Sequence, residues 1–173
     1  ESQRVLRLAS RYESTGAGLY AQDLVEFVPK WKLLAGLRWD RLVGDYDAIA
    51  IPANAPGPET VASYRMKVSE LSKRAGLLFQ PNERMSFHFS YATSFNTSGD
   101  AYSLSAANGD IPPEQSINLE LGAKFDSADG NFSARVAAFR STKLHERNTD
   151  PTVNLVTLSG KRHVAGLELD LSG

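Results

Sequence analysis

Apolar and polar side chains alternate with a period of two residues along much of this chain. Such alternation places successive side chains on opposite faces of a β-strand. From clearest to weakest, the alternating segments are 85–92, 117–126, 31–40, 165–171, 70–79 and 19–27. Asp23 and Lys73 interrupt two of the apolar faces, and the segment after Asn131 shifts parity before Phe139. With a partial strand near 3–12 and a long last strand near 153–171, the pattern predicts an all-β antiparallel meander of about eight strands.

The expected turns differ strongly in length. Aromatic residues flank each short turn, and the flanking pairs are Phe27 and Trp31, Phe79 and Phe87, and Phe125 and Phe132. The other connections are long and polar, roughly 43–65, 96–113 and 142–152. Alternating short and long connections, with aromatic residues at the short-turn end, are typical of an outer-membrane β-barrel wall. Some strands exceed ten residues, the length that crosses a bilayer when tilted.

A second aromatic row is predicted at the long-loop end. Trp31 and Trp39 lie eight residues apart on one face, roughly 20 Å along the membrane normal for a strand tilted by about 40°. Phe87 and Phe95 have the same spacing. The predicted membrane girdle therefore consists of Phe27, Trp31, Trp39, Phe79, Phe87, Phe95, Phe125 and Phe132.

The opposite faces of the strands carry charges of both signs. The residues concerned are Arg38, Asp40, Glu70, Arg74, Glu120, Lys124, Asp126, Glu168 and Asp170. In a barrel these side chains face the lumen, whereas a soluble β-sandwich exposes the same residues to water. A soluble β-sandwich acting as a binding or adhesion module and a closed eight-strand barrel therefore remain alternatives at this point. Gly36, Gly76, Gly122 and Gly166 lie on the same polar faces, where close packing or strand bending favours glycine.

Composition narrows the function classes. The 173 residues carry a net charge of −1, which argues against a nucleic-acid partner. Cysteine is absent, which removes disulfides, thiolate metal sites and cysteine nucleophiles. No apolar run is long enough for a transmembrane helix. Neither end has the features of a natural terminus, so we expect an internal piece of a longer chain.

An enzymatic function is not predicted. The sequence contains no nucleophile elbow, zinc-protease, phosphate-loop or dinucleotide-binding motif. His88, His145 and His163 are scattered and form no recognisable metal-ligand spacing. We expect no catalytic residues, no bound metal and no cofactor.

Six segments in this order resemble the barrel of TonB-dependent siderophore receptors. They are 19–26 (LYAQDLVE), 31–40 (WKLLAGLRWD), 74–81 (RAGLLFQP), 90–96 (SYATSFN), 113–124 (PEQSINLELGAK) and 160–170 (GKRHVAGLELD). The resemblance covers nearly the whole chain, and 141–160 is most similar to catecholate-type members. It implies that residues 1–173 are part of a barrel of about 22 strands. Compared with that family pattern, we expect residues 1–173 to lack the plug domain, the remaining strands and the aromatic C-terminal residue.

The resemblance also implies a function and partners. Such receptors lie in the bacterial outer membrane as multi-pass β-barrels and import ferric siderophores through energy supplied by the TonB–ExbB–ExbD complex acting on the plug. The expected partners are thus a ferric siderophore, the protein's own plug domain, the TonB complex and outer-membrane lipid. Siderophore contacts are expected from aromatic and basic residues on the long-loop side, namely Tyr46, Tyr64, Arg65, Tyr102, Lys143, His145 and Arg147. Plug or lumen contacts are expected from Arg38, Asp40, Glu70, Arg74, Glu120, Lys124, Glu168 and Asp170.

Overall fold

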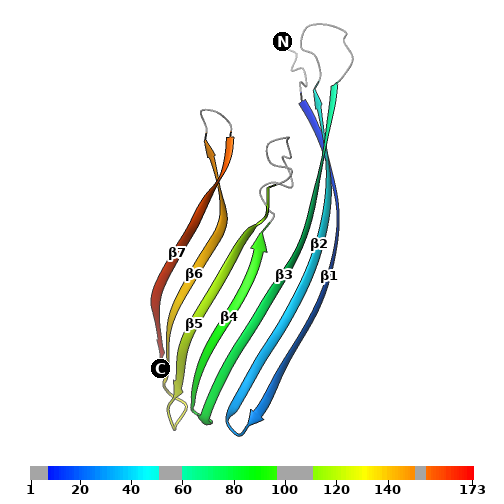
Figure 1. Cartoon of the computed structure of the whole chain (residues 1–173). Helices are drawn as coiled ribbons and strands as arrows, with labels where there is room; N and C mark the ends of the chain where they lie inside the picture. The colour runs from blue at the N-terminus through cyan, green and yellow to red at the C-terminus, as the bar shows by residue number, and fades with distance from the viewer. Residues whose placement is uncertain (1–7, 51–59, 97–110, 151–154) are drawn as a thin grey trace, which may run out of the picture.

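The computed structural model describes residues 8–50, 60–96, 111–150 and 155–173. Within these ranges seven strands form one antiparallel sheet, in which each strand pairs with its neighbours in chain order (Figure 1). The strands are β1 Leu8–Val28, β2 Trp31–Ala50, β3 Thr60–Asn82, β4 Met85–Asn96, β5 Glu114–Asp126, β6 Ser133–Asp150 and β7 Leu155–Ser172. The predicted all-β meander is confirmed. No helix in the described ranges is long and apolar enough to cross a membrane.

The strand count is corrected from about eight to seven because β1 is continuous. Residues 8–12 of the predicted partial strand near 3–12 and the segment 19–27 belong to the same strand, Leu8–Val28, and residues 3–7 lie outside the described residues. Gly16 pairs with Leu42 and Gly18 with Asp40, so the ladder to β2 runs without interruption through the small residues between the two segments. Apolar and polar side chains do not alternate between these two segments, but the backbone hydrogen bonds of the ladder form without such alternation.

The long connections are shorter than the sequence indicated. β2 and β3 remain paired as far as Ala50 and Thr60, and β6 pairs with β7 as far as Asp150. Much of 43–65 and 142–152 is therefore strand. These extensions mix polar and apolar side chains on both faces, so alternation does not reveal them. The described strand ends that the long connections join lie at one end of the sheet, and the short turns lie at the other (Figure 1).

One face of the sheet is apolar and uncovered. It contains Leu121, Leu167 and Leu169, whose relative exposures are 61%, 82% and 69%. The buried hydrophobic core of the described ranges consists of Met66 and Val68. A β-sandwich would cover this face with a second sheet, and the described residues contain a single sheet. The soluble-sandwich alternative is therefore not supported, and β1 and β7 do not pair to close a small barrel.

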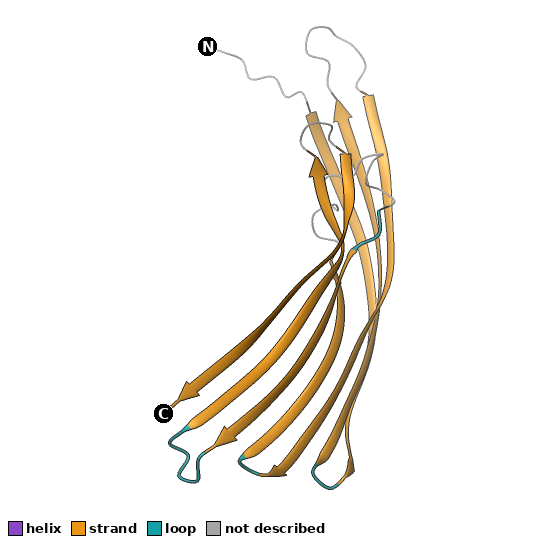
Figure 2. Cartoon of the chain, turned by 60° about the vertical axis from the view of Figure 1, so that its left-hand side comes forward, coloured by secondary structure: helices purple, strands orange, loops and turns teal. Residues whose placement is uncertain are grey.

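The sheet divides towards the long-loop end. β3 pairs with β4 only up to Arg74 and Ala92, whereas β3 continues along β2 to Thr60. Just beyond this point the Lys73 backbone N–H donates to the Thr93 hydroxyl at 2.8 Å, so a side chain replaces a ladder bond. Figure 2 shows the ends of β1–β3 rising away from the rest of the curved sheet.

Candidate functional site

Three tyrosines form a row across the polar face near the long-loop end. Tyr12 on β1 lies opposite Tyr46 on β2, which in turn lies opposite Tyr64 on β3. The Tyr12 ring extends over Gly44, where a Cβ would come within 2.6 Å of the Tyr12 hydroxyl oxygen. The ladder thus places three half-buried phenol rings on one surface. We call Tyr12, Tyr46 and Tyr64 the tyrosine row.

The tyrosine row adjoins a small apolar cluster. Met66 and Val68 are buried at its centre, and the surrounding apolar residues are Tyr12, Leu42, Tyr46, Tyr64 and Phe95. Phe95 was predicted in the membrane girdle, but the structure places it against Met66 and Val68 of the polar face. This contact lies where β3 no longer pairs with β4, beyond Arg74 and Ala92. Gln115, the ladder partner of Phe95, likewise contacts the polar face of β3 there, at Glu70.

Two carboxylates face each other below the tyrosine row. Asp40 on β2 lies directly opposite Glu70 on β3. Arg38 donates to Asp40 from Nε and Nη2 at 2.8 and 2.7 Å, and Gln115 donates to Glu70 at 3.0 Å from β5. The bidentate arginine and the amide offset the repulsion between like charges that oppose each other on adjacent strands.

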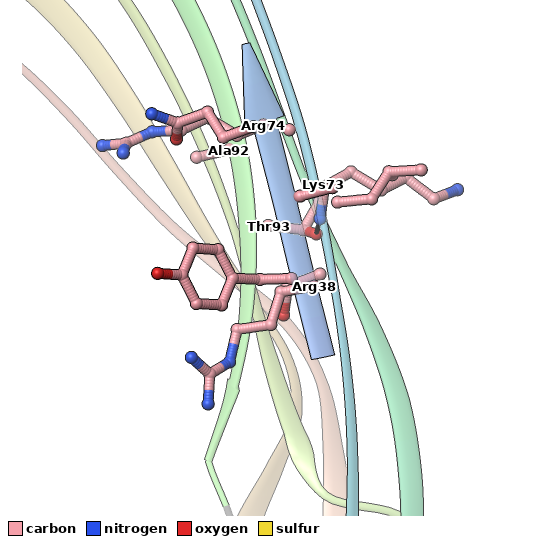
Figure 3. A pocket seen from close by; sticks show the side chains of 11 residues that line it. Arg38, Lys73, Arg74, Ala92 and Thr93 are labelled. Carbon is pink, nitrogen blue, oxygen red and sulfur yellow. Dashed lines mark hydrogen bonds between the residues drawn. The ribbon is translucent and has the colours of Figure 1, made fainter. Parts of the chain in front are cut away.

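A hollow of about 360 Å³ lies beside this charged group, formed by β1–β4. Tyr20, Gln22, Arg38 and Arg74 line it on the polar face. Figure 3 shows Arg38 and Arg74 projecting to the same side of the sheet and Lys73 projecting to the opposite side. Arg38 is engaged by Asp40, but the Arg74 guanidinium has no hydrogen bond or ion pair among the described residues. Arg74 is therefore available to an acidic group brought into the lumen.

A histidine–carboxylate pair lies on the neighbouring strands. His88 Nε2 is 2.7 Å from a Glu120 carboxylate oxygen, and the His88 ring covers Gly122. A Cβ on Gly122 would come within 2.4 Å of His88 Cε1. This contact explains one of the polar-face glycines without a plug domain, and Gly166 under Phe139 is a second case. A Cβ added at Gly36 or Gly76 would meet its nearest atoms at 3.4 Å, which is ordinary van der Waals contact.

The eight residues predicted to face the lumen all lie on this polar face by strand register. Four of them have a side-chain partner in the sheet. Arg38 pairs with Asp40, Gln115 donates to Glu70, and His88 contacts Glu120. The others, Arg74, Lys124, Glu168 and Asp170, have no ion pair or side-chain hydrogen bond in the described part of the chain. Contact between these residues and a plug domain stays a prediction.

The residues predicted to bind substrate are only partly brought together. Tyr46 and Tyr64 meet in the tyrosine row, but they lie in strands rather than in loops. Arg65 projects from the opposite face and pairs with Asp45 at 3.4 Å. It therefore cannot contact a ligand on the polar face together with its neighbour Tyr64.

The remaining substrate candidates lie elsewhere. Lys143 and His145 belong to β6, where Lys143 pairs with Glu114 at 3.1 Å and His145 Nδ1 lies 3.3 Å from the Pro113 carbonyl oxygen. Arg147 is on the same strand. Tyr102 lies outside the described residues. No cluster of three metal-ligating side chains occurs within the described ranges.

The aromatic residues at the short turns form a stacked row on the apolar face. The Trp31 and Phe79 rings are 4.5 Å apart between centroids, and the Phe79 and Phe87 rings are 6.2 Å apart. At the other end of the apolar face, Trp39 Nε1 donates to the Ser69 hydroxyl at 3.0 Å. Exposed rings at both ends of an apolar band are the arrangement that a membrane girdle requires.

Sequence reasoning missed Tyr12 and Gln115 as members of the polar-face site. Tyr12 fell in a segment with poor alternation, and nothing in the sequence marked it as opposite Tyr46. Gln115 reaches Glu70 across the end of β4, a contact between residues 45 positions apart in sequence. The register of β1 and β2 reveals the Tyr12 contact. The Gln115 contact forms where β3 no longer pairs with β4, and the ladder register does not predict it.

The fold, the exposed apolar face and the charged polar face together define a segment of a transmembrane β-barrel wall. Residues 4–173 match the family model described as TonB dependent receptor-like, beta-barrel. The chain belongs to this family.

Three relatives show what the chain is similar to. The probable TonB-dependent siderophore receptor PiuA of Acinetobacter baumannii is 33% identical over 171 residues, and the match covers 93% of this chain and 22% of PiuA. The PiuA crystal structure superimposes with a TM-score of 0.76 at 30% identity, covering 95% of this chain and 23% of PiuA. The metal-pseudopaline receptor CntO of Pseudomonas aeruginosa is 28% identical over 162 residues, covering 93% of this chain and 22% of CntO.

The third relative shows the fold alone. The ferric-catecholate import receptor Fiu of E. coli, in its closed form, has a TM-score of 0.76 at 21% identity, covering 95% of this chain and 26% of Fiu. The chain thus spans about a fifth to a quarter of the length of the relatives it matches.

Proposed function

We propose that this chain forms part of the barrel wall of an outer-membrane receptor that imports ferric siderophores. The observation that carries the proposal is the match to PiuA, which extends over nearly the whole chain in both sequence and structure. The amphipathic sheet supports it, since its exposed apolar face suits lipid and its charged face suits an aqueous or plugged lumen.

In this proposal the polar face performs two tasks. The tyrosine row, at the long-loop end, contacts the incoming iron complex, because phenol rings offer both stacking and hydrogen bonding to a bulky aromatic chelator. Arg74 and the Arg38–Asp40 pair, deeper in the lumen, contact the plug domain. Uptake then depends on TonB, ExbB and ExbD acting through that plug. The chelated iron is the cargo, so no protein ligand to iron is needed.

The chelate class is proposed as catecholate. The fold similarity to Fiu and the resemblance of 141–160 to catecholate-type members favour it. The relative CntO, whose name specifies a metal–pseudopaline complex, has comparable identity to this chain. The experiment therefore compares chelates of different chemistry.

The test is uptake of radiolabelled iron by cells that express the full-length receptor and lack other iron receptors. A ferric catecholate is expected to support uptake that stops when TonB is absent, whereas a ferric hydroxamate is not. Tyr46→Ala with Tyr64→Ala is expected to weaken binding of the catecholate by about tenfold or more, given about 1 kcal/mol for each lost aromatic contact. Uptake that is equal with and without TonB would contradict the proposal.

A further inference from the structure

Basic side chains gather around Trp39 on the apolar face of β2 and β3. Lys73 and Ser69 are the diagonal neighbours of Trp39 across the ladder, and Arg41 follows Trp39 on the same face of β2. Lys67 is in turn the diagonal neighbour of Arg41. Diagonal positions lie about 7–8 Å apart, within reach of long side chains. We call Trp39, Arg41, Lys67 and Lys73 the Trp39 basic patch.

The patch lies on the outer side of the wall, away from the lumen. Lys73 projects to the side opposite Arg38 and Arg74 in Figure 3. Its two neighbours along the outer face of β3 are Leu71 and Ala75, and Leu71 is 49% exposed. The polar-face site described above therefore cannot use these cations.

The three cations have no anionic partner among the described residues. Arg41, Lys67 and Lys73 are all exposed, and their charged groups take part in no ion pair or hydrogen bond within the described ranges. The next carboxylate on this face of β2 is Asp45, which already pairs with Arg65 at 3.4 Å. Arg41 and Lys67 are like charges at diagonal positions and repel each other, so this pair, with Lys73 on the other side of Trp39, favours an external anion.

The position of the patch identifies the kind of anion. Lys73 lies six residues from Phe79 along β3, about 15 Å along the membrane normal, and a lysine stem can extend further to place its ammonium at the interface. Arg41 and Lys67 lie beyond Trp39 towards the long-loop end. Tryptophan marks the level of lipid head groups, and basic residues at that level attract anionic lipids.

We propose that the Trp39 basic patch binds the phosphate groups of an anionic lipid in the leaflet at the long-loop end. The guanidinium of Arg41 suits a phosphate in a bidentate geometry, and the two ammonium groups supply further charge. The Trp39 ring lies against the upper acyl chains, held by its hydrogen bond to Ser69. This inference rests on the proposed function only in placing the wall in the outer membrane.

The test uses the purified full-length receptor in detergent, with native mass spectrometry to count retained lipids. The probes are lipid A with both phosphates, dephosphorylated lipid A and phosphatidylcholine. Only the phosphorylated lipid A is expected to be retained. Replacing Arg41, Lys67 and Lys73 together by Gln is expected to lower its affinity by about a hundredfold, at about fivefold for each cation near a charged membrane surface.

Two further variants keep the result decisive. Lys32→Gln removes a cation from the opposite face of β2 and is expected to leave lipid retention unchanged. The pair Lys67→Arg and Lys73→Arg preserves charge and should retain the lipid. If the triple Gln variant does not fold, the single variants carry the test, each with about a fivefold loss.

The outcomes separate this inference from the proposed function. The lipid site alone is overturned if a folded, uptake-competent receptor retains lipid A equally well with and without its phosphates. It is also overturned if the triple Gln substitution leaves retention unchanged. If the unmodified receptor does not import the ferric siderophore but retains phosphorylated lipid A selectively, the proposed substrate is overturned and the lipid site remains supported. Competition by free inorganic phosphate at equal affinity would show a bare anion site and also overturn the lipid assignment.

Discussion

Phe139 on β6 lies across Gly166 on β7, its direct partner in the ladder, and fills the space that a side chain at 166 would occupy. A Cβ at Gly166 would come within 2.8 Å of Phe139 Cζ. The two residues therefore form a complementary pair on the polar face, one without a side chain and one with a large ring. This pairing explains an aromatic residue among polar neighbours.

The Phe139–Gly166 pair yields a test by double substitution. Gly166→Ala is expected to destabilise the sheet by about 1–3 kcal/mol, because the new methyl group displaces the ring. Phe139→Leu should restore much of that loss in the double variant, since the smaller side chain makes room. Urea unfolding in detergent micelles measures each variant. Additive losses in the double variant would show that the two residues do not interact.

Phe139 also shows what sequence could and could not predict. Period-two alternation identified the strands, the turns and the apolar face, because each depends on side chains of one segment alone. In the sequence, Phe139 made the alternation after Asn131 look as if it changed faces. In the structure β6 alternates regularly, with Ala134, Val136 and Ala138 on the apolar face and Phe139 on the polar face. The cause lies on another strand, at Gly166, and no local pattern contains it.

The candidate site likewise combines residues that the sequence predicted with contacts that only the register of the strands shows. The sequence placed Tyr46 and Tyr64 at the long-loop end, but their meeting with Tyr12 follows from the register of three strands. Tyr64 and Arg65 were both predicted to contact the siderophore as an aromatic and a basic residue on the long-loop side, but strand geometry sends them to opposite faces. Predicting the site would have required knowing that β2 and β3 stay paired as far as Ala50 and Thr60, past the point where alternation ends.

The Pro29-Lys30 turn carries backbone strain that can be relieved. Lys30 has a φ of 72°, in the left-handed region that disfavours residues with a side chain. A turn with proline at its second position and positive φ at its third favours glycine at the third. Lys30→Gly is therefore expected to stabilise the β1–β2 hairpin by a few tenths to about 1 kcal/mol, after the entropy cost of glycine.

The measurement is urea unfolding in detergent micelles, compared with Lys30→Ala as the matched control. Alanine also removes the ammonium group but keeps the strain, so it should leave stability near that of the unmodified protein. Equal effects of glycine and alanine would assign the change to lost charge rather than to backbone conformation.

The β5–β6 turn is expected to weaken in acid. Hydrogen bonds from the Ser127 hydroxyl, and then from the Asn131 backbone and side chain, lower the pKa of Asp129 below 3.8. A carboxyl with a depressed folded-state pKa stabilises the turn above its unfolded pKa. That stabilisation is lost as the pH falls below 3.8 and through the lower folded-state value. Asp129→Asn should therefore flatten the dependence of stability on pH in this window.

Other carboxyl groups titrate in the same range, so the informative quantity is a difference. Unfolding midpoints of the unmodified protein and Asp129→Asn are compared from neutral pH down to pH 3 or below. Ser127→Ala, which removes the largest cause of the depressed pKa, should reduce the difference. A constant difference between the two proteins across this range would refute the assignment to Asp129.

Trp31 and Trp39 provide the most direct test of the membrane placement. They are the only two tryptophans in the chain, and they lie at opposite ends of the apolar face. Single-tryptophan versions, in which every other tryptophan of the full-length receptor is replaced by phenylalanine, are reconstituted into vesicles containing lipids brominated at a shallow or a deep acyl position. Both residues are expected to be quenched more strongly by the shallow bromine, because interfacial rings sit near the head groups. Trp39→Phe in the Trp39-only protein is the blank. Stronger quenching by the deep bromine, or quenching equal to that of a soluble tryptophan analogue, would place the apolar face elsewhere than across a bilayer.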